Sequence, residues 1–449
     1  MRISLFTALF FLSTCLIYSQ IIPSWSDVPN APFGSRKNDL VFVTPQLGFT
    51  ASGAREAHRT TNAGVTWTRM FYSDSTFFRS VAFGNERIGF LGNLGPDEYG
   101  GASITDPTLI YRTSDGGTTW RPVTNISGPL GRGVCGMHAL DSNLVFAVGR
   151  VRGPSVFMKS TDGGLSWTSK DMSSLAAGLV DVHFFSPDTG IAVGLTNSEH
   201  AQSRGVVLYT TDGGENWSTK YSSSRAGEWC WKISFPSRNT GYISLQRNQG
   251  SPCNFIKTTD GGTSFFEKQF YPTNYYSQGI GFVNDTLGWI GGNSIQTTLM
   301  STNGGDTWEP ANFGVRINRF FFINELSGFA SGQTIYKYTG QLSTGVKENP
   351  AAPSDFELSQ NYPNPFNPVT KIRFTVPELK SLKAGPGLLY VELKIFDAAG
   401  KLVMSVVNEE KQPGENEIEI NASHLPSGVY YYQIQAGTFT DTKKMILLK

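Results

Sequence analysis

The chain has 449 residues and a formal net charge of +1, and only 16% of its residues are charged. A nearly neutral chain gives no support to a nucleic-acid partner, which would need a basic surface. In contrast, 13% of the residues are aromatic and 49 are glycine. This composition is typical of a large domain of many short strands joined by tight turns.

The N-terminal segment, residues 1–19, has the features of a secretory signal peptide. Arg2 precedes an apolar run from Leu5 to Ile17, and the small residue Ser19 follows it. The run is shorter than the roughly 20 residues that a membrane-spanning helix needs. A lipoprotein signal is the alternative, because residues 12–15 loosely resemble a lipobox that ends at Cys15. We therefore expect an exported chain.

Three cysteines follow this segment: Cys135, Cys230 and Cys253. Export permits disulfides, and Cys230 and Cys253 fall within one repeat, so a bridge between them and free thiols are both open alternatives. The sequence has no CxxC pair and no Cys/His spacing typical of a metal site. We therefore predict no metal and no cofactor.

An eight-residue phrase, Ser/Thr-x-Asp-x-Gly-x-x-Trp, recurs six times, and its best copy runs from Ser160 to Trp167. The copies begin 53, 47, 50, 48 and 43 residues apart. This period is that of one four-stranded sheet with its turns, so it predicts a β-propeller. The six copies start at Thr60, Thr113, Ser160, Thr210, Thr258 and Ser301.

A second pattern, an apolar strand and turn followed by an apolar run that usually starts with Gly, precedes each phrase and occurs seven times. The seventh unit ends near Tyr338 without a phrase. The mature N-terminus, residues 21–26 with Trp25, resembles the segment that follows each phrase. We therefore predict a seven-bladed propeller over residues 20–340, in which the N-terminal segment supplies the outer strand of blade seven. Such closure removes open sheet edges.

Within the phrase, the Asp side chain can bond backbone N–H groups of its own turn, and Gly adopts a conformation that a Cβ would penalise. The aromatic residue can then pack between neighbouring sheets. An alternative role as cation ligands or catalytic carboxylates is less favoured, because the phrases of successive blades would lie far apart. The residues with this predicted structural role are Asn62, Trp67, Asp115, Trp120, Asp162, Trp167, Asp212, Trp217, Asp260, Phe265, Asn303 and Trp308.

The phrase resembles the Asp box of bacterial neuraminidase-repeat (BNR) proteins. The seven units from Ile21 to Gly340 resemble most the propellers of photosystem II stability/assembly factors. Asp boxes also recur in sialidases, xyloglucan-active glycosidases and sortilin-type receptors, so the resemblance implies a fold and not a chemistry. The chain lacks a convincing sialidase arginine triad, and the xyloglucan-active enzymes resemble two propellers where this chain has one.

Residues 341–354, rich in Pro, Ala and Gly, form a predicted linker. Beyond it, residues 355–449 carry six alternating strands, which predict a small immunoglobulin-like β-sandwich. The expected strands are 369–376, 390–396, 402–407, 415–420, 428–435 and 441–448.

Four phrases of this segment, 356–368, 395–400, 425–430 and 443–449, resemble the type A C-terminal sorting domain of the type IX secretion system. The resemblance implies that the secretion machinery is a partner and that the chain crosses the outer membrane. It also implies that the mature protein is released or held at the cell surface. The terminal strand 443–449 is the expected contact with the machinery.

A candidate ligand site lies where the innermost strands begin. Aligning the seven units places a mixed polar and aromatic ring there, which is typical of a binding entrance. The alternative is that this mouth is only where water reaches the strands. Unequal loops, 92–109, 195–205 and 246–254, favour binding on the same face. The candidate residues are Asp39, Arg79, Asp181, Glu228, Trp229, Trp231, Gln278 and Asn318.

These features lead to two functional hypotheses. The first is an exported, non-catalytic propeller that binds an extracellular protein or glycan. The second is a secreted glycoside hydrolase, which needs two carboxylates about 5 to 9.5 Å apart across one cleft. Carboxylates that are exposed or paired with arginine would count against the enzyme. Its candidate carboxylates are Asp39, Asp97, Glu98, Asp181 and Glu228, while His138 and His183 are expected to pack within the inner strands.

Overall fold

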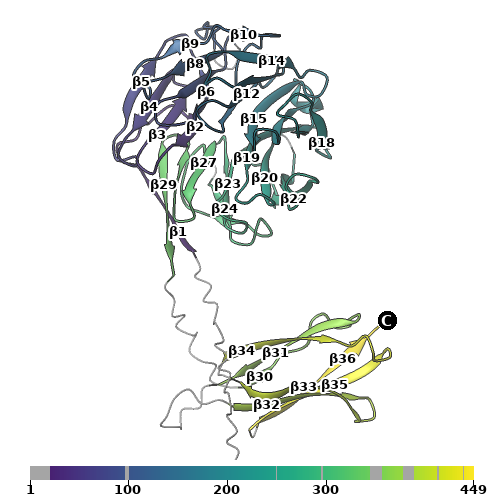
Figure 1. Ribbon diagram of the computed structural model, residues 1–449. Coiled ribbons are helices and arrows are strands. Elements are labelled where there is room, and N and C mark those ends of the chain that lie inside the picture. Colours follow the sequence, from purple (N-terminus) through teal and green to yellow (C-terminus); the bar gives the residue numbers. More distant parts are fainter. Residues whose placement is uncertain are drawn as a thin grey trace, which may run out of the picture. The chain divides into compact units, whose positions relative to one another are not determined.

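The computed structural model describes residues 21–96, 101–248, 250–294, 297–343, 356–377, 389–411, 414–437 and 439–449. These residues form two compact units that divide after Ser343. Apart from one 3₁₀ turn, His200–Gln202, the regular structure of both is β, which confirms the predicted fold class (Figure 1). Within the described ranges no helix is long and apolar enough to cross a membrane. The predicted signal segment and residues 344–354 of the predicted linker lie outside the described residues.

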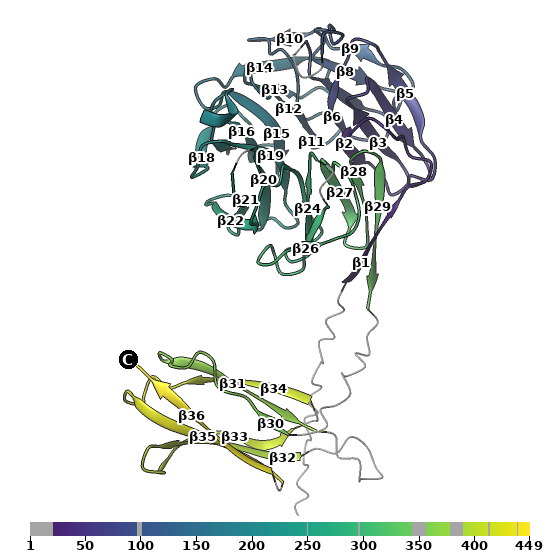
Figure 2. The ribbon, with the colours of Figure 1, turned by 180° about the vertical axis from the view of Figure 1, so that it is seen from behind.

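The N-terminal unit contains seven antiparallel sheets arranged as the blades of a propeller (Figures 1 and 2). Blade one contains β2 (Lys37–Phe42), β3 (Gly48–Ser52), β4 (Glu56–Thr60) and β5 (Thr68–Tyr72), and blade two contains β6 (Phe78–Phe83), β7 (Gly89–Asn93), β8 (Ile110–Thr113) and β9 (Arg121–Pro122). Blade three contains β11 (Gly136–Ala139), β12 (Val145–Gly149), β13 (Val156–Ser160) and β14 (Trp167–Asp171). A short fifth strand of this sheet, β10 (Ile126–Ser127), runs parallel to β14.

Blade four contains β15 (Gly178–Phe184), β16 (Gly190–Leu195), β17 (Gly205–Thr210) and β18 (Ser218–Ser222). Blade five contains β19 (Glu228–Ser234), β20 (Gly241–Arg247), β21 (Cys253–Thr258) and β22 (Phe266–Tyr271). Blade six contains β23 (Ser277–Phe282), β24 (Gly288–Gly292), β25 (Leu299–Ser301) and β26 (Glu309–Pro310). Blade seven is β27 (Arg319–Asn324), β28 (Ser327–Ser331), β29 (Ile335–Leu342) and β1 (Ile21–Asp27).

The N-terminal strand β1 is the outer strand of blade seven, so the predicted ring closure is confirmed. It pairs antiparallel with β29 along its whole length, with Trp25 opposite Tyr338. The indole of Trp25 also stacks on Phe313, with ring centroids 4.3 Å apart, and meets Trp289 edge-on at 5.4 Å. The two ends of the propeller sequence are therefore joined by backbone pairing and by aromatic packing.

The blades pack through an inner-strand Phe that lies over the Gly that opens the second strand. In blade four, a Cβ on Gly190 would come within 2.8 Å of the Phe184 ring, which itself stacks at 3.5 Å on Phe146 of blade three. A larger residue at this position would push the ring away from its neighbour. This contact explains why glycine starts the second half of most repeat units in the sequence.

Each phrase forms the turn between the third and fourth strands of its blade. In the best copy, Asp162 Oδ1 accepts the backbone N–H of Ser166 at 2.9 Å and the hydroxyl of Ser160 at 2.9 Å. Gly164 has a φ of 78°, and a Cβ there would lie 2.1 Å from Phe90. Trp167 is buried and meets Phe90 of blade two edge-on at 5.8 Å. The turn thus fixes one blade and supplies the ring that packs on the next.

All three described cysteines are free and buried, so a bridge between Cys230 and Cys253 is not formed. Cys230 lies on β19 and Cys253 on β21, and β20 runs between these two strands. The thiol of Cys230 packs in the apolar cluster of Ile191 and Val207 from blade four, whereas Cys253 packs with Phe282 and Leu299 of blade six. The two side chains therefore face opposite neighbours.

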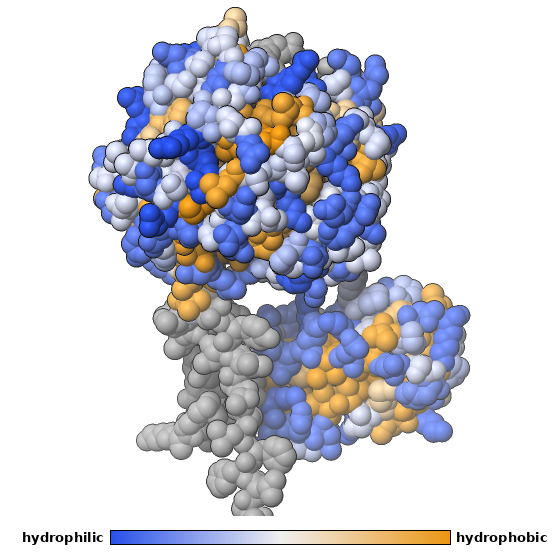
Figure 3. Space-filling model, turned by 45° about the horizontal axis from the view of Figure 1, so that its top comes forward, coloured by the Kyte–Doolittle hydropathy of each residue, from blue (hydrophilic) through white to orange (hydrophobic). Residues whose placement is uncertain are grey.

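The C-terminal unit is a sandwich of two sheets, with all six predicted strands at their expected places. One sheet contains β30 (Glu357–Leu358), β31 (Val369–Val376) and β34 (Gly414–Asn421), and the other contains β33 (Leu402–Lys411), β32 (Leu389–Asp397), β35 (Gly428–Ala436) and β36 (Phe439–Leu447). Both units carry scattered apolar areas on an otherwise hydrophilic surface (Figure 3).

The proline-rich phrase of the sandwich joins its first and last strands. Asn361 is buried, and its Nδ2 donates to the hydroxyl of Thr370 on β31 at 3.0 Å. Phe366 exchanges backbone hydrogen bonds with Ile446 and Leu448 at 2.9 Å each, so it extends the pairing of the chain end. The phrase therefore holds the terminal strand in place.

Candidate functional site

The seven inner strands surround a channel with a cavity at each end. The mouth cavity, near the start of the inner strands, has a volume of about 760 Å³ and includes Asn38, Trp231 and Gln278. The opposite cavity, near the strand ends, has a volume of about 710 Å³ and includes Phe42 and Phe282. Asn38 and Phe42 belong to the same strand, β2. The two cavities therefore lie at opposite ends of one set of strands.

A buried ionic cluster lies between these ends. The guanidinium of Arg319 donates to both carboxylate oxygens of Asp181, at 2.8 and 3.0 Å, and to Asp39 at 2.7 Å. Burial alone would raise the pKa of Asp181, but the charges of Arg319 and Lys232 hold it below its ordinary value. Burial lowers the pKa of Lys232, whose Nζ lies 3.9 Å from Asp181, to about 8. Blades one, four, five and seven are thus linked across the channel.

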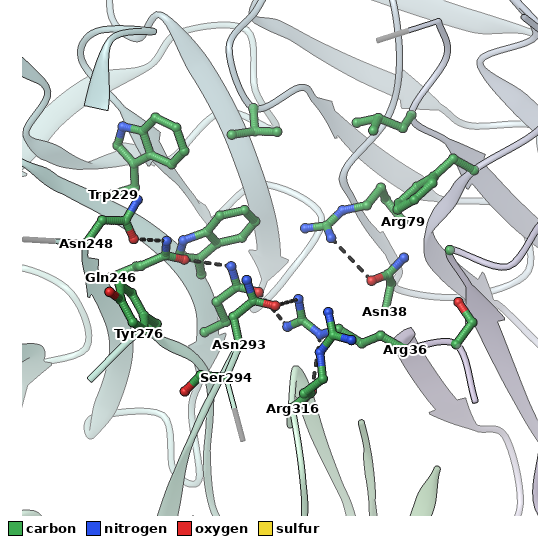
Figure 4. Close-up of a pocket in the computed structure, with 17 residues that line it drawn as sticks. Arg36, Asn38, Arg79, Trp229, Gln246, Asn248, Tyr276, Asn293, Ser294 and Arg316 are labelled. Atoms are coloured by element: carbon green, nitrogen blue, oxygen red, sulfur yellow. Dashed lines mark hydrogen bonds between the residues drawn. The ribbon is translucent and has the colours of Figure 1, made fainter. Parts of the chain in front are cut away.

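The mouth cavity is lined by basic, amide and aromatic side chains (Figure 4). Its guanidinium groups come from Arg36, Arg79 and Arg316, and none of its described lining residues is an aspartate or a glutamate. The rest of the polar lining consists of Ser35, Asn38, Gln246, Asn248, Tyr276, Gln278, Asn293 and Ser294. Such a cavity favours a ligand that carries negative charge.

The Arg36 guanidinium is held by neighbouring amides. Its nitrogens donate to Asn293 Oδ1 at 2.8 Å, to Asn318 Oδ1 at 2.7 Å and to Gln278 Oε1 at 2.5 Å. Gln278 Nε2 in turn donates a hydrogen bond to Gln246 Oε1 at 2.6 Å. Arg36, which lies directly before β2, therefore joins blade one to blades six and seven. The partners of its hydrogen bonds are other groups of the protein.

The sequence-predicted site residues divide between three places. The mouth cavity brings together Arg79, Trp229, Trp231 and Gln278. Asn318 is fully buried beside it and bonds Arg36. Asp39 and Asp181, expected at the mouth, instead lie in the ionic cluster and border the opposite cavity.

Glu228 is also absent from the mouth cavity. It is fully buried, and its Oε1 lies 2.6 Å from Arg225 and 3.5 Å from Arg247. Burial raises its pKa. Of the remaining carboxylates of the enzyme hypothesis, Asp97 and Glu98 lie outside the described residues.

The two aspartates were misplaced because the alignment of units one and four is one residue out of register. The inner-strand residues paired with the glycine that opens the second strand are Phe42 in blade one and Phe184 in blade four. The residue four positions before Phe42 is Asn38, which does line the mouth cavity. Asp39 and Asp181 lie one position further along their strands, and a shift of one residue turns a side chain to the other face.

Sequence reasoning missed Asn38 of β2 and the residues that the connecting loops contribute: Ser35, Arg36, Phe77, Tyr276, Asn293, Ser294 and Arg316. Most of them lie just before an inner strand or in the connections between second and third strands. Gln246 and Asn248 do belong to a loop singled out by its length. The residues directly before the inner strands differ in type from blade to blade, so no recurring signal in the sequence marked the others.

In the opposite cavity, two histidines stack on one another. The rings of His138 and His183 lie 4.9 Å apart, and His138 Nδ1 accepts the backbone N–H of Phe184 at 3.1 Å. Burial lowers the pKa of both, to about 4 for His138 and about 3 for His183. Among the described residues, no group of three or more His, Cys, Asp or Glu side chains is placed to hold a metal ion.

Sequence profiles of two families match the chain. Residues 360–448 match the secretion system C-terminal sorting domain, and residues 208–219 match the BNR/Asp-box repeat. No protein of curated function matches the sequence significantly.

Several solved structures share the fold at low sequence identity. YCF48 bound to D1 peptide is 15% identical with a TM-score of 0.52, over 71% of this chain and 96% of that chain. PorZ, a surface component of the type IX secretion system of Porphyromonas gingivalis, is 12% identical with a TM-score of 0.50, over 94% of this chain. This chain spans only 60% of PorZ.

The GH74 enzyme of Niastella koreensis is also 12% identical with a TM-score of 0.50, over 93% of this chain and 73% of that chain. These likenesses establish the fold and include both an enzyme and proteins of other roles. The chain is thus a BNR-type Asp-box propeller followed by a type IX secretion C-terminal sorting domain, which makes it a secreted or cell-surface protein.

Proposed function

We propose that this chain is an exported, non-catalytic binding protein whose mouth cavity takes an acidic segment of an extracellular protein. The observation that carries the proposal is the charge of the cavity, which has three guanidinium groups and no described carboxylate. A cavity of one sign attracts a ligand of the other sign and repels basic ones. YCF48, solved with a bound peptide, shows that a propeller of this fold can take a peptide ligand.

The burial of the two tryptophans favours a peptide ligand over a glycan. Sugar stacking needs an open ring face, but Trp229 is only 3% and Trp231 only 6% exposed. The guanidinium carbon of Arg79 lies 5.2 Å from the Trp231 ring centroid and covers one face of it. The cavity therefore offers hydrogen-bond donors in preference to flat aromatic surface.

The carboxylates argue against glycoside hydrolysis. Asp39 and Asp181 share one guanidinium, and Glu228 bonds two others in a buried position outside both cavities. A general acid needs a carboxyl that stays protonated near neutral pH, whereas the pKa of Asp181 is held low. Burial raises the pKa of Glu228, but this residue lines neither cavity. The nearby carboxylate of Glu267 accepts hydrogen bonds from Tyr221 and Asn254 and lines neither cavity as well.

The test is fluorescence anisotropy of the full chain with three labelled decapeptides that differ only in net charge, from acidic through neutral to basic. We expect the acidic peptide to bind at least about tenfold more tightly than the neutral one, with an affinity that falls as salt rises. Equal affinity for all three peptides would contradict the proposal. Release of sugars from xyloglucan or another polysaccharide would instead support the enzyme.

A further inference from the structure

Arg79, in the wall of the mouth cavity, has one edge of its guanidinium without a partner. The side chain is only 7% exposed, yet neither Nε nor Nη2 has a hydrogen-bond partner among the described residues. Buried polar groups of folded proteins are nearly always paired, and an unpaired charged donor costs more than a neutral one. The unpaired edge therefore points to a group that the isolated chain lacks.

The position of Arg79 is fixed by its other contacts. Its Nη1 donates to Asn38 Oδ1 at 3.3 Å, and Asn38 in turn donates to the backbone of Phe78 at 2.7 Å. The guanidinium plane rests on Trp231. Figure 4 shows Arg79 reaching into the cavity from the side opposite Trp229 and Gln246. The free edge is thus held in one place before any ligand arrives.

The chemistry of this edge is specific. The N–H bonds of Nε and Nη2 run parallel, and their spacing matches that of the two oxygens of a carboxylate. The ammonium group of a lysine offers no such parallel pair of donors. The indole N–H groups of Trp229 and Trp231, which line the same cavity, are also buried and have no hydrogen-bond partner in the described part of the chain. These two indole N–H groups and the Nε and Nη2 groups of Arg79 are all hydrogen-bond donors. They therefore favour a ligand group that only accepts hydrogen bonds, such as a carboxylate.

We infer that Arg79 anchors a carboxylate of the bound peptide through two parallel hydrogen bonds. The inference rests on the proposed function, because it names the group that the mouth cavity recognises. The hydrogen bonds of Arg319 to Asp39 and Asp181 span the channel between the mouth cavity and the opposite cavity. Both a chain-terminal carboxylate and an Asp or Glu side chain carry the required group.

Three small probes separate these sources: N-acetylglycine has a terminal carboxylate, N-acetylaspartic acid α-amide has only a side-chain carboxylate, and N-acetylglycinamide has none. Each is titrated into the full chain, labelled with ¹⁵N at tryptophan and arginine, and the resonances of Trp229 and Trp231 Nε1 and Arg79 Nε are followed. We expect saturable shifts with at least one carboxylate probe and none with N-acetylglycinamide. The tighter of the two acids identifies the source of the carboxylate.

The variant Arg79→Lys keeps the charge but loses the parallel pair of donors, and we expect at least a tenfold weaker affinity for the better probe. The control Arg121→Lys makes the same exchange at an exposed residue of β9, outside the lining of the mouth cavity, and should change the affinity less than twofold. If Arg79→Lys does not fold, Asn38→Asp serves instead. Its new carboxylate would pair with Arg79 and compete with the probe.

An affinity of Arg79→Lys within twofold of the unmodified chain would overturn the inference, because the cavity would then respond to charge alone. An equal loss in Arg121→Lys would overturn it too, because the loss would then not depend on Arg79. Binding of N-acetylglycinamide as tight as that of the better carboxylate probe would overturn it as well. Each of these results leaves the proposed function standing if the acidic decapeptide still binds best. Absence of shifts with every probe would overturn the inference, and failure of the acidic decapeptide would overturn the proposed function independently.

Discussion

Arg319 donates two hydrogen bonds to Asp181 across the propeller channel, at 2.8 and 3.0 Å. The same guanidinium bonds Asp39, so one residue of blade seven neutralises a carboxylate from blade four and another from blade one. The two carboxylates that a sequence-based view would assign to catalysis are thereby engaged in holding blades together. Ligand recognition is left to the mouth cavity on one side of this cluster.

Replacing Arg319 by Met should destabilise the propeller by about 3–5 kcal/mol, because two buried carboxylates then lose their cation. Urea unfolding at neutral pH measures the loss. Arg316→Met, at an exposed site in a neighbouring loop, is the matched control and should change the unfolding free energy by less than about 0.5 kcal/mol. A similar stability of both variants would show that the cluster does not hold the ring.

The Asp boxes should make stability depend on acid pH. Hydrogen bonds from Ser166 lower the pKa of Asp162 to about 2, and equivalent donors do the same for Asp115, Asp212 and Asp260. An unfolded aspartate titrates near about 3.9, so this stabilisation is complete above about pH 4 and is lost as the pH falls towards about 2.

The measurement is the urea midpoint between about pH 5 and pH 2. The chain itself provides the control chemistry, since Asn62 and Asn303 occupy the same position with a side chain that does not titrate. A variant with Asn in the other four boxes should lose less stability over this range than the unmodified chain. Identical pH profiles would show that these carboxylates contribute nothing.

The ring closure predicts a strong effect at Trp25. Trp25→Ala removes a ring that packs on Phe313 and Trp289, and we expect a cost of about 3 kcal/mol. Thermal unfolding checks this, with Ile22→Ala on the exposed face of the same strand as the control. Comparable melting temperatures for the two variants would contradict the closure.

The thiols offer a simple chemical check. Under denaturing, non-reducing conditions, a thiol-reactive dye should find Cys135, Cys230 and Cys253 all free. In the native state all three should react slowly, because they are buried, and burial raises the pKa of Cys230 and Cys253. Detection of Cys135 alone after unfolding would mean that the other two are bridged.

The fold was predictable because its signals are local. The spacing of the Asp boxes, the Gly that faces an inner-strand Phe, and the alternation of the sandwich strands each repeat in the sequence and need no long-range information. The outer strand around Trp25 followed from one missing phrase. These features determine the blade number before any distance is known.

The site was less predictable because it depends on strand register, on loop residues and on contacts between blades, none of which recurs as a pattern in the sequence. Asp39 and Asp181 lie one residue beyond the position of their strands that the alignment was meant to find, and the loop residues Arg36 and Arg316 come from outside the aligned strands. The relation between Cys230 and Cys253 depends likewise on which neighbouring blade each thiol faces. Such features follow from the packing of all blades together.

The central claim, that the mouth cavity and not the opposite one binds the ligand, can be tested by photo-cross-linking. A photoreactive phenylalanine replaces either Asn248, which lines the mouth cavity, or Asn324, which lines the opposite cavity, and each variant is irradiated with the labelled acidic decapeptide. We predict covalent labelling of the Asn248 variant that an excess of unlabelled acidic peptide prevents, and no specific labelling of the Asn324 variant. Specific labelling from position 324 alone would contradict the account.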